Sequence, residues 1–309
     1  MMKSHRPLLA IALRAGAMVL LSTMLMLVKY AGQLGVSVPE ILFWRMLITL
    51  PVLLIRLGTR GQLGRLATRR IGTHARRAAL GMVALFCNIT AALLLPLAEA
   101  TTFSFTTPLF VVLITGLFLQ EKVGPWRWAA VVLGFVGVLI IAQPGAAPVS
   151  MLGVAAGLGA GILVALVSFQ VSDLARTEDA TTCVFWFAFF GALFASVLMP
   201  AYHGNHSLAA WGVILAIGLT GTLAQLLLTA ALRYGQVATV VVMDYTSLIW
   251  ATLYGWLIWG HFPSHATWLG APAIVAAGLV ITWREHVRSR HVSPTSALSE
   301  AGPDDQRET

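Results

Sequence analysis

The stretch AEATTFSFTTPLFVVLITGLFLQEK, residues 98–122, decides how this chain folds. Its apolar run is long enough to cross a bilayer, because a membrane-spanning helix needs about 20 mostly apolar residues. Pro108 lies inside the run, and a proline inside such a helix is a place where the helix can kink. We therefore predict one membrane-spanning helix over residues 99–119.

A second copy of this stretch follows 140 residues later in the chain. With that shift five residue pairs coincide: Ala98 with Ala238, Thr106 with Thr246, Leu113 with Leu253, Leu117 with Leu257 and Trp128 with Trp268. Five helices then fall in each copy, and an odd number means that the second copy enters the membrane upside down. Such an inverted repeat is typical of secondary transporters.

The rest of the chain is as apolar as these two copies. Of its 309 residues 58% are hydrophobic and 10% are charged, and the mean hydropathy is +0.83. Soluble domains are about 25% charged, so the composition excludes a soluble enzyme as well as a disordered chain. The apolar runs are continuous, whereas outer-membrane strands alternate apolar and polar residues. The sequence therefore predicts an all-α polytopic membrane protein with ten transmembrane helices, over 9–31, 40–57, 78–97, 99–119, 126–143, 150–170, 182–201, 208–231, 236–259 and 266–283.

These helices divide the chain into three parts. Residues 1–144 form the first repeat, residues 145–283 form the second, and the polar tail 284–309 is predicted to be disordered. If the N-terminus lies in the cytoplasm, the loop lysines and arginines all fall on the cytoplasmic side, with a basic loop over 58–77. Because positive charge marks the cytoplasmic side, we predict an inner-membrane protein with both termini cytoplasmic. The net charge of +8 then indicates contact with membrane lipids and not with nucleic acid.

The repeated stretches also resemble a known family. The run from Ala98 to Lys122, and the later runs DYTSLIWA from Asp244 and GWLIWGHFP over 255–263, are similar to the two copies found in EamA-type permeases of the drug/metabolite transporter superfamily. The resemblance covers nearly the whole chain, and it implies a transporter with a substrate cavity between its halves. The family usually has an acid at the end of both copies. Here the first copy has Glu121 and the second has His261, so the role of that second position stays open.

Polar residues inside the predicted helices are the first candidates for the substrate site, because charged groups in a membrane are costly and mark functional sites. Asp244 shares one helical face with Ser247 and Tyr254. We predict that these line a cavity together with the following residues of other helices: Ser104, Thr107, Asn88 and Gln225. Two alternatives remain open, namely that Asp244 bonds a neighbouring helix and that the hydroxyls bond their own backbone.

Cations in the outer half of the first two helices form a second group of candidates. Lys29 and Arg45, beside Trp44, would attract a carboxylate or phosphate if they faced a cavity. The alternative is that their long side chains reach the lipid headgroups. Arg14 lies near the inner leaflet and is expected to reach the headgroups in this way.

Two acids and four histidines lie near the external loops. Glu40 and Glu99 are expected to pair with Lys29 or Arg45. The spacing of the histidines matches no metal-ligand motif, so we expect them to be solvated: His203, His206, His261 and His265. Neither a metal nor a cofactor is predicted.

The sequence thus predicts a secondary transporter that moves a small zwitterionic or anionic metabolite, an amino acid or a derivative, by alternating access. Proton coupling through Asp244 is left open, as is a homodimer. An exchanger of S-adenosylmethionine-like compounds and a drug-type exporter are the transport alternatives. An intramembrane enzyme is disfavoured, because the chain has neither a Gly-x-Ser-x-Gly nor a His-Glu-x-x-His motif. A channel is the remaining alternative without a transport cycle.

Overall fold

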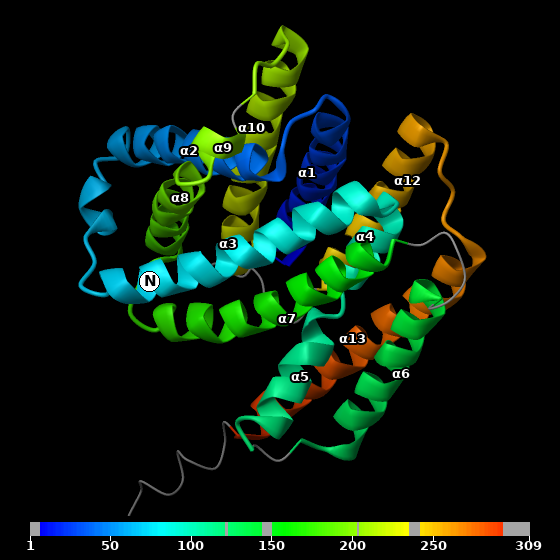
Figure 1. Ribbon diagram of the computed structural model, residues 1–309. Coiled ribbons are helices and arrows are strands. Elements are labelled where there is room, and N and C mark those ends of the chain that lie inside the picture. Colours follow the sequence, from blue (N-terminus) through cyan, green and yellow to red (C-terminus); the bar gives the residue numbers. More distant parts are fainter. Residues whose placement is uncertain (1–6, 121–122, 144–149, 203, 235–241, 293–309) are drawn as a thin grey trace, which may run out of the picture.

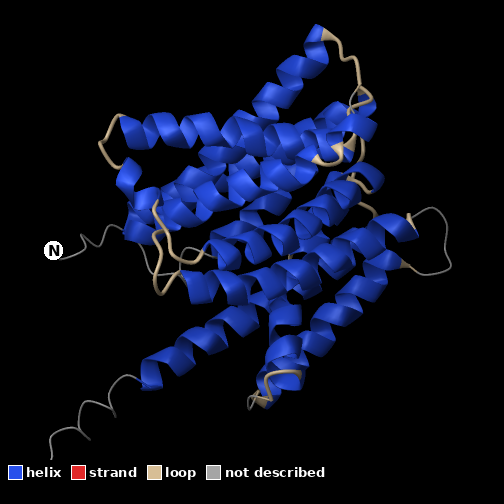
Figure 2. Ribbon diagram, turned by 60° about the vertical axis from the view of Figure 1, so that its left-hand side comes forward, coloured by secondary structure: helices blue, strands red, loops and turns tan. Residues whose placement is uncertain are grey.

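The computed structural model describes residues 7–120, 123–143, 150–202, 204–234 and 242–292. These residues form helices joined by loops, with no strand in the ranges just given (Figures 1 and 2). In chain order the elements are α1 (Pro7–Gln33), α2 (Val38–Gly58), η1 (Leu63–Leu66), α3 (Ile71–Leu94), α4 (Leu97–Ser104), α5 (Thr107–Leu117), α6 (Pro125–Ala142), α7 (Met151–Leu174), α8 (Ala180–Ser196), α9 (Met199–Tyr202), α10 (Leu208–Tyr234), η2 (Val242–Thr246), α12 (Ser247–Trp259) and α13 (His265–Val292).

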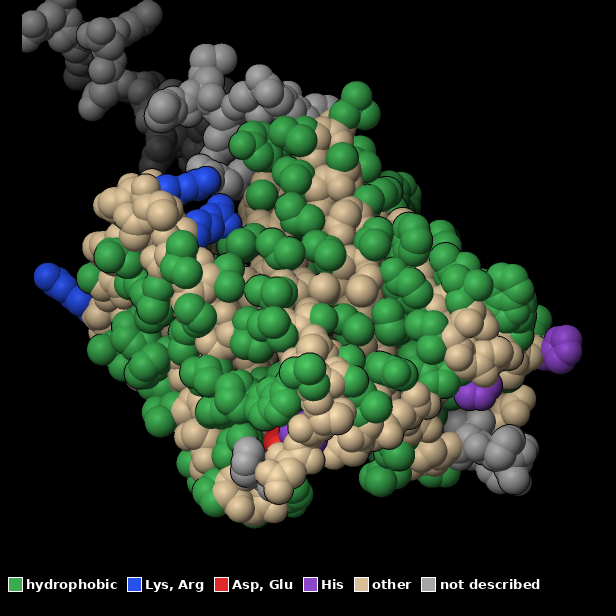
Figure 3. Space-filling view, turned by 90° about the horizontal axis from the view of Figure 1, so that it is seen from above, with side chains coloured by type: hydrophobic (Ala, Val, Ile, Leu, Met, Phe, Trp, Pro, Cys, Tyr) green, Lys and Arg blue, Asp and Glu red, His purple; other side chains and the backbone are tan. Residues whose placement is uncertain are grey.

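The helices are long and apolar enough for a membrane protein. Within the described residues eight segments could each cross a bilayer, and α8 is a shorter apolar helix of 17 residues. Large apolar side chains such as Leu152 and Ile249 are exposed, and Figure 3 shows hydrophobic side chains over most of one face, with basic ones gathered at one edge. Exposed apolar surface on this scale is stable only against lipid. The predicted all-α polytopic membrane fold is confirmed.

The packing of the helices shows the two-fold relation between the repeats. α1 lies along α10 and α3 lies along α7. α1 is the first helix of the first repeat, and α10 is the third long helix of the second repeat. α3 is the third long helix of the first repeat, and α7 is the first helix of the second, so the same pairing occurs with the repeats exchanged. α2 packs on α8 and α6 packs on α13, and each of these pairs joins one helix to its own mate. This exchange of partners is what two copies related by a two-fold axis produce.

The fourth predicted helix is broken in the middle. α4 ends at Ser104 and α5 begins at Thr107. The predicted membrane span is confirmed, since Leu97–Leu117 is long and apolar enough to cross a bilayer, but it is two helices and not one continuous helix. Pro108 lacks an amide hydrogen, and its ring would clash with the carbonyl of Ser104 in a continuous helix. The hydroxyl of Thr107 donates to that carbonyl at 3.0 Å, which satisfies the backbone group that the break leaves without a partner.

In the second copy the type of helix changes at the equivalent position. η2 gives way to α12 at Ser247, which is the repeat mate of Thr107. The hydroxyl of Ser247 donates to the carbonyl of Asp244 at 2.6 Å, as Thr107 does to Ser104. The described part of the predicted helix 236–259 is therefore a short 3-10 helix followed by an α-helix, and Leu248 stands where the first copy has proline. Residues 235–241, at the predicted start of this helix, lie outside the described residues.

Two helices extend into segments that were predicted to be polar loop or tail. α3 begins at Ile71, so the predicted basic loop 58–77 is shorter and contains the turn η1. α13 continues to Val292, past the predicted end at 283, because arginine and glutamate are good helix formers outside the apolar run. The predicted disorder of the tail is therefore wrong up to Val292, and residues 293–309 lie outside the described residues.

The last helices of the two repeats, α6 and α13, cross at very short range. A Cβ atom on Gly137 would lie 2.6 Å from the carbonyl oxygen of Gly270, and one on Gly270 would lie 2.5 Å from the carbonyl oxygen of Gly137. Glycine at both positions lets the two backbones touch, as small residues commonly do between membrane helices.

Candidate functional site

A cavity of about 730 Å³ lies on the side of the molecule that carries η1 and the α7–α8 loop. We call this side the basic side, and we name the cavity the basic cavity because four arginines line it: Arg14, Arg56, Arg65 and Arg77. Gln225 and Thr229 of α10 also line it, and Glu178 and Asp179 come from the α7–α8 loop. The arrangement suits a small molecule that carries negative charge.

A smaller pocket of about 70 Å³, which we name the end pocket, adjoins the basic cavity. Arg77, Val184 and Gln225 line both spaces. The end pocket lies between α2, α3, α8 and α10, and Arg45 and Thr49 of α2 complete it together with Thr222. No carboxylate of the described residues lines this pocket, so both of its charged side chains are cations.

Arg45 and Arg77 are held differently. Gly221 of α10 leaves space for Arg45, since a Cβ atom there would lie 3.1 Å from its Nε. Within the part of the chain that the structure describes, the Arg45 guanidinium forms no hydrogen bond or ion pair. Arg77 lies over the ring of Phe187 at 4.4 Å and donates to the carbonyl of Cys183 at 3.3 Å. Its Nε is buried without a hydrogen-bond partner among the described atoms.

Asp244 forms a two-pronged ion pair with Arg14 of α1. The Nε and Nη2 atoms of Arg14 each lie 2.6 Å from one carboxylate oxygen. The expectation that Arg14 reaches the headgroups is therefore wrong, because a charge inside a membrane protein is more stable beside an opposite charge. Of the two roles left open for Asp244, the observed contact fits the bond to a neighbouring helix. Arg14 also lines the basic cavity, whereas Asp244 is not among its lining residues.

The other polar candidates mostly bond one another or the backbone. Asn88 donates to Ser104 Oγ at 3.1 Å, and Thr107 bonds the carbonyl of Ser104. The hydroxyl of Tyr254 lies 2.9 Å from Thr23 Oγ1 on α1. None of these, nor Ser247, lines a described pocket. Of the polar residues predicted to share a cavity, the structure places Gln225 in both spaces and Arg45 in the end pocket.

Lys29 and Trp44 do not join Arg45 in one cavity. Lys29 Nζ donates to the carbonyls of Ala92 and Leu95 at 3.1 and 2.5 Å, where it caps the C-terminus of α3. Trp44 packs edge-on against Trp211 at 5.0 Å. The expected pair of outer cations is therefore separated, because α3 offers Lys29 its free carbonyls.

On the side opposite the basic side, two buried acids tie the repeats together. Glu40 is 1% exposed, and its carboxylate lies 2.8 Å from His206 Nε2 and 3.0 Å from the amide of Gly204. Glu99 is 5% exposed and accepts a hydrogen bond from Thr267 at 3.1 Å. The predicted pairing of Glu40 with Lys29 or Arg45 is wrong, and His206 is not solvated, because Glu40 finds its donors in the second repeat. Glu99 lies close enough to Lys29 for the two charges to interact, although the described residues show no ion pair between them within 4.0 Å.

Arg77 lines both spaces but was not a predicted site residue, because it falls within the basic loop predicted over 58–77. Its helical face could have been found, because Arg77, Gly81 and Ala84 follow one another at spacings of four and three residues. Gly81 faces the same Phe187 ring that Arg77 covers. Of the two positions that end the repeated stretches, Glu121 lies outside the described residues, and His261 is exposed in the loop between α12 and α13.

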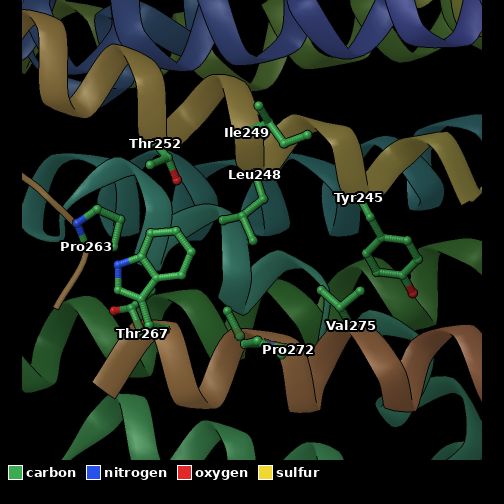
Figure 4. A pocket seen from close by; sticks show the side chains of 10 residues that line it. Tyr245, Leu248, Ile249, Thr252, Pro263, Thr267, Pro272 and Val275 are labelled. Atoms are coloured by element: carbon green, nitrogen blue, oxygen red, sulfur yellow. The ribbon is translucent and has the colours of Figure 1, made fainter. Parts of the chain in front are cut away.

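An apolar pocket of about 460 Å³ lies between α12 and α13. In Figure 4, Leu248 and Ile249 project from one helix while Thr267 and Pro272 project from the facing one. Ile249 and Trp268 at its rim are exposed on the apolar surface. The residues that line this pocket carry no charge, so it does not suit an anionic or zwitterionic molecule.

Known proteins resemble this chain over most of its length. A riboflavin transporter of Vibrio cholerae is 29% identical over 85% of this chain and 89% of its own length. The pseudopaline exporter CntI of Pseudomonas aeruginosa is 29% identical over 84% of this chain and 91% of its own. An S-adenosylmethionine uptake transporter of Rickettsia bellii is 26% identical over 62% of this chain and 65% of its own length.

A solved crystal structure shares the fold, with a TM-score of 0.59 and 21% identity over 90% of this chain and 98% of the other. The model of the EamA-like transporter family matches residues 8–143 and 151–283, one match in each repeat. Because these two matches take in all but the termini and the connection between the repeats, the chain belongs to the EamA-like transporter family.

Proposed function

We propose that this secondary transporter moves a small anionic or zwitterionic metabolite, with amino acids and their derivatives as the first substrates to test. The observation that carries the proposal is the basic cavity, which four arginines line and which continues into the end pocket with a fifth, Arg45. Guanidinium groups bind carboxylates and phosphates through paired hydrogen bonds. Two acids, Glu178 and Asp179, also line the basic cavity, and either could receive a substrate ammonium group in competition with its present partner, Thr68 or Arg65.

Alternating access is supported by the difference between the two sides of the molecule. The basic side holds the basic cavity, whereas Glu40 and Glu99 join the two repeats on the opposite side. A carrier that works by alternating access closes one side while the other is open. With the basic side in the cytoplasm of the bacterial cell, as the charge distribution predicts, this arrangement corresponds to an inward-open state.

The Arg14–Asp244 pair is the proposed link between substrate and proton. A substrate carboxylate in the basic cavity would compete with Asp244 for Arg14. A proton on Asp244 would free the guanidinium for the substrate, and loss of that proton would restore the ion pair. Binding of the anion and of the proton at this pair would therefore favour each other.

The relatives named for riboflavin, pseudopaline and S-adenosylmethionine support a metabolite as the cargo. These relatives are named for three different compounds, so we choose the first substrates to test from the charge of the basic cavity. S-adenosylmethionine-like compounds are the second candidate, since such a molecule carries an amino acid group as well as a positive charge. A drug-type exporter is the third.

The test is counterflow in proteoliposomes. Vesicles loaded with one unlabelled compound are diluted into the same labelled compound, across a panel of amino acids, organic acids, S-adenosylmethionine and riboflavin. We expect saturable uptake of at least one anionic or zwitterionic compound, and a changed pH dependence in Asp244→Asn. Exchange of riboflavin alone would refute the proposed substrate class, and conductance without saturation would indicate a channel.

A further inference from the structure

We propose that the end pocket is a subsite for the oxyanion group of the transported molecule, a carboxylate or a phosphate held between Arg45 and Arg77. This inference rests on the proposed function and adds to it the place and chemistry of one contact. The pocket brings together two guanidinium groups from different helices, with no carboxylate of the described residues among its lining. Two like charges repel each other, and an anion between them offsets this repulsion by attracting both.

The size of the pocket limits what can enter it. About 10–15 Å³ is enough to hold one water molecule, so a space of about 70 Å³ admits a group of a few atoms. A carboxylate or phosphate fits this limit, whereas a whole metabolite does not. The body of the molecule would remain in the adjoining basic cavity, which is about ten times larger at about 730 Å³.

Arg45 is placed for this contact before any ligand arrives. It lies on α2 within a membrane-spanning segment, where a cation without an anionic partner is costly. Among the described residues no acid pairs with it, and Gly221 keeps the space beside its Nε open. An anion that arrives with the substrate would supply the missing partner.

Arg77 offers a fixed second donor. The ring of Phe187 supports its guanidinium plane, and one Nη atom is bound to the carbonyl of Cys183. Its Nε, which is buried without a partner in the described part of the chain, remains to donate. A planar guanidinium held in this way loses little freedom when it binds an oxyanion.

The hydroxyls in the pocket are already occupied. Thr49 donates to the carbonyl of Arg45 at 2.8 Å, and Thr222 donates to the carbonyl of Gly218 at 2.7 Å. Each hydroxyl has one hydrogen, so neither is free to donate to a ligand. The donors that remain are the two arginines and the side-chain amide of Gln225, for which no hydrogen bond appears among the described residues. The oxyanion would therefore be bound mainly by charge.

The test measures binding of simple anions to the purified full-length protein in detergent. Isothermal titration and thermal shift are recorded with sodium phosphate, sulfate, acetate and succinate, with sodium chloride at matched ionic strength as the blank. We expect at least one oxyanion to bind, and Arg45→Gln and Arg77→Gln each to weaken it about tenfold or more, which corresponds to about 1.4 kcal/mol. Comparison of the affinity for phosphate with the affinities for acetate and succinate shows which of the two groups the pocket prefers.

The matched control is Arg60→Gln, which removes the same charge from an exposed position outside both spaces. It should bind the anion as the wild type does. Arg45→Lys keeps the positive charge but loses the planar guanidinium group with its paired hydrogen bonds. This variant should bind the oxyanion with intermediate affinity, and it serves as the test even if Arg45→Gln fails to fold. Absence of oxyanion binding in the wild type, or equal loss in the Arg60 variant, would overturn the proposal.

The outcomes also separate this inference from the proposed function. If counterflow shows exchange of an anion while Arg45→Gln and Arg77→Gln bind and carry it normally, the subsite is wrong and the transport proposal stands. If the end pocket binds oxyanions but no anionic or zwitterionic compound is exchanged, the subsite stands and the proposed substrate class fails.

Discussion

Removal of one partner from the Arg14–Asp244 ion pair should lower the free energy of unfolding. The size of the loss depends on how deeply the two side chains are buried. Breaking a fully buried ion pair costs about 3–5 kcal/mol, whereas exposed pairs contribute about 0.2–1 kcal/mol. The Arg14 side chain is 12% exposed and that of Asp244 is 30% exposed. The pair lies between these limits, so we expect a coupling free energy of about 1–3 kcal/mol.

The assay is a double-mutant cycle on thermal unfolding in detergent. The variants are Arg14→Gln, Asp244→Asn and the double variant, and 1 kcal/mol shifts Tm by about 2–4 °C in proteins of 150–250 residues. Each single variant should unfold at a lower temperature than the wild type. The double variant should be less destabilised than the sum of the two, because the second change removes the charge that the first left unpaired.

A matched control is the Arg70–Asp173 ion pair on the basic side, whose side chains are more exposed. The cycle of Arg70→Gln and Asp173→Asn should give a coupling below about 1 kcal/mol. Effects of Arg14→Gln and Asp244→Asn that simply add, within about 0.5 kcal/mol, would refute the reasoning, since they would show that the two charges do not stabilise each other.

Three further predictions concern other contacts. Glu40→Gln removes the charge that faces His206 on the side opposite the basic side, so a cysteine introduced at that side should react faster with a membrane-impermeant thiol reagent; an unchanged rate would argue against a closing role. Gly137→Leu should prevent correct folding, measured as loss of the monodisperse peak in size-exclusion chromatography, because the backbone of Gly270 cannot move away as a side chain can; an intact peak would contradict the close crossing. Pro108→Ala should leave the interruption between α4 and α5 in place, because in the second copy η2 gives way to α12 at the equivalent position without a proline; a solved structure of the variant with one continuous helix would show that proline alone causes the interruption.

The fold class could be predicted from the sequence because long apolar runs are local signals. The transporter function was predicted from the internal repeat and from the resemblance to EamA-type permeases. Membership of the EamA-like transporter family confirms that the protein is a transporter and not an enzyme. The orientation of the termini, the substrate and the lack of a cofactor remain predictions. So do the domain boundaries and the choice between monomer and homodimer.

The contacts of the site were harder to predict. Arg14 and Asp244 are separated by 230 positions, and no local pattern indicates such a pair. Arg77 was assigned to a loop because its neighbours are polar, although α3 already begins at Ile71. The change from η2 to α12 at Ser247 was not predicted, because no proline or glycine marks it in the sequence.

The backbone contact between Gly137 and Gly270 has a consequence for how the two repeats can move. Sliding of α6 along α13 would push side chains into the place where each glycine now meets a carbonyl oxygen. Rotation about that point keeps the contact. We therefore expect the repeats to move by tilting about this crossing and not by sliding along it.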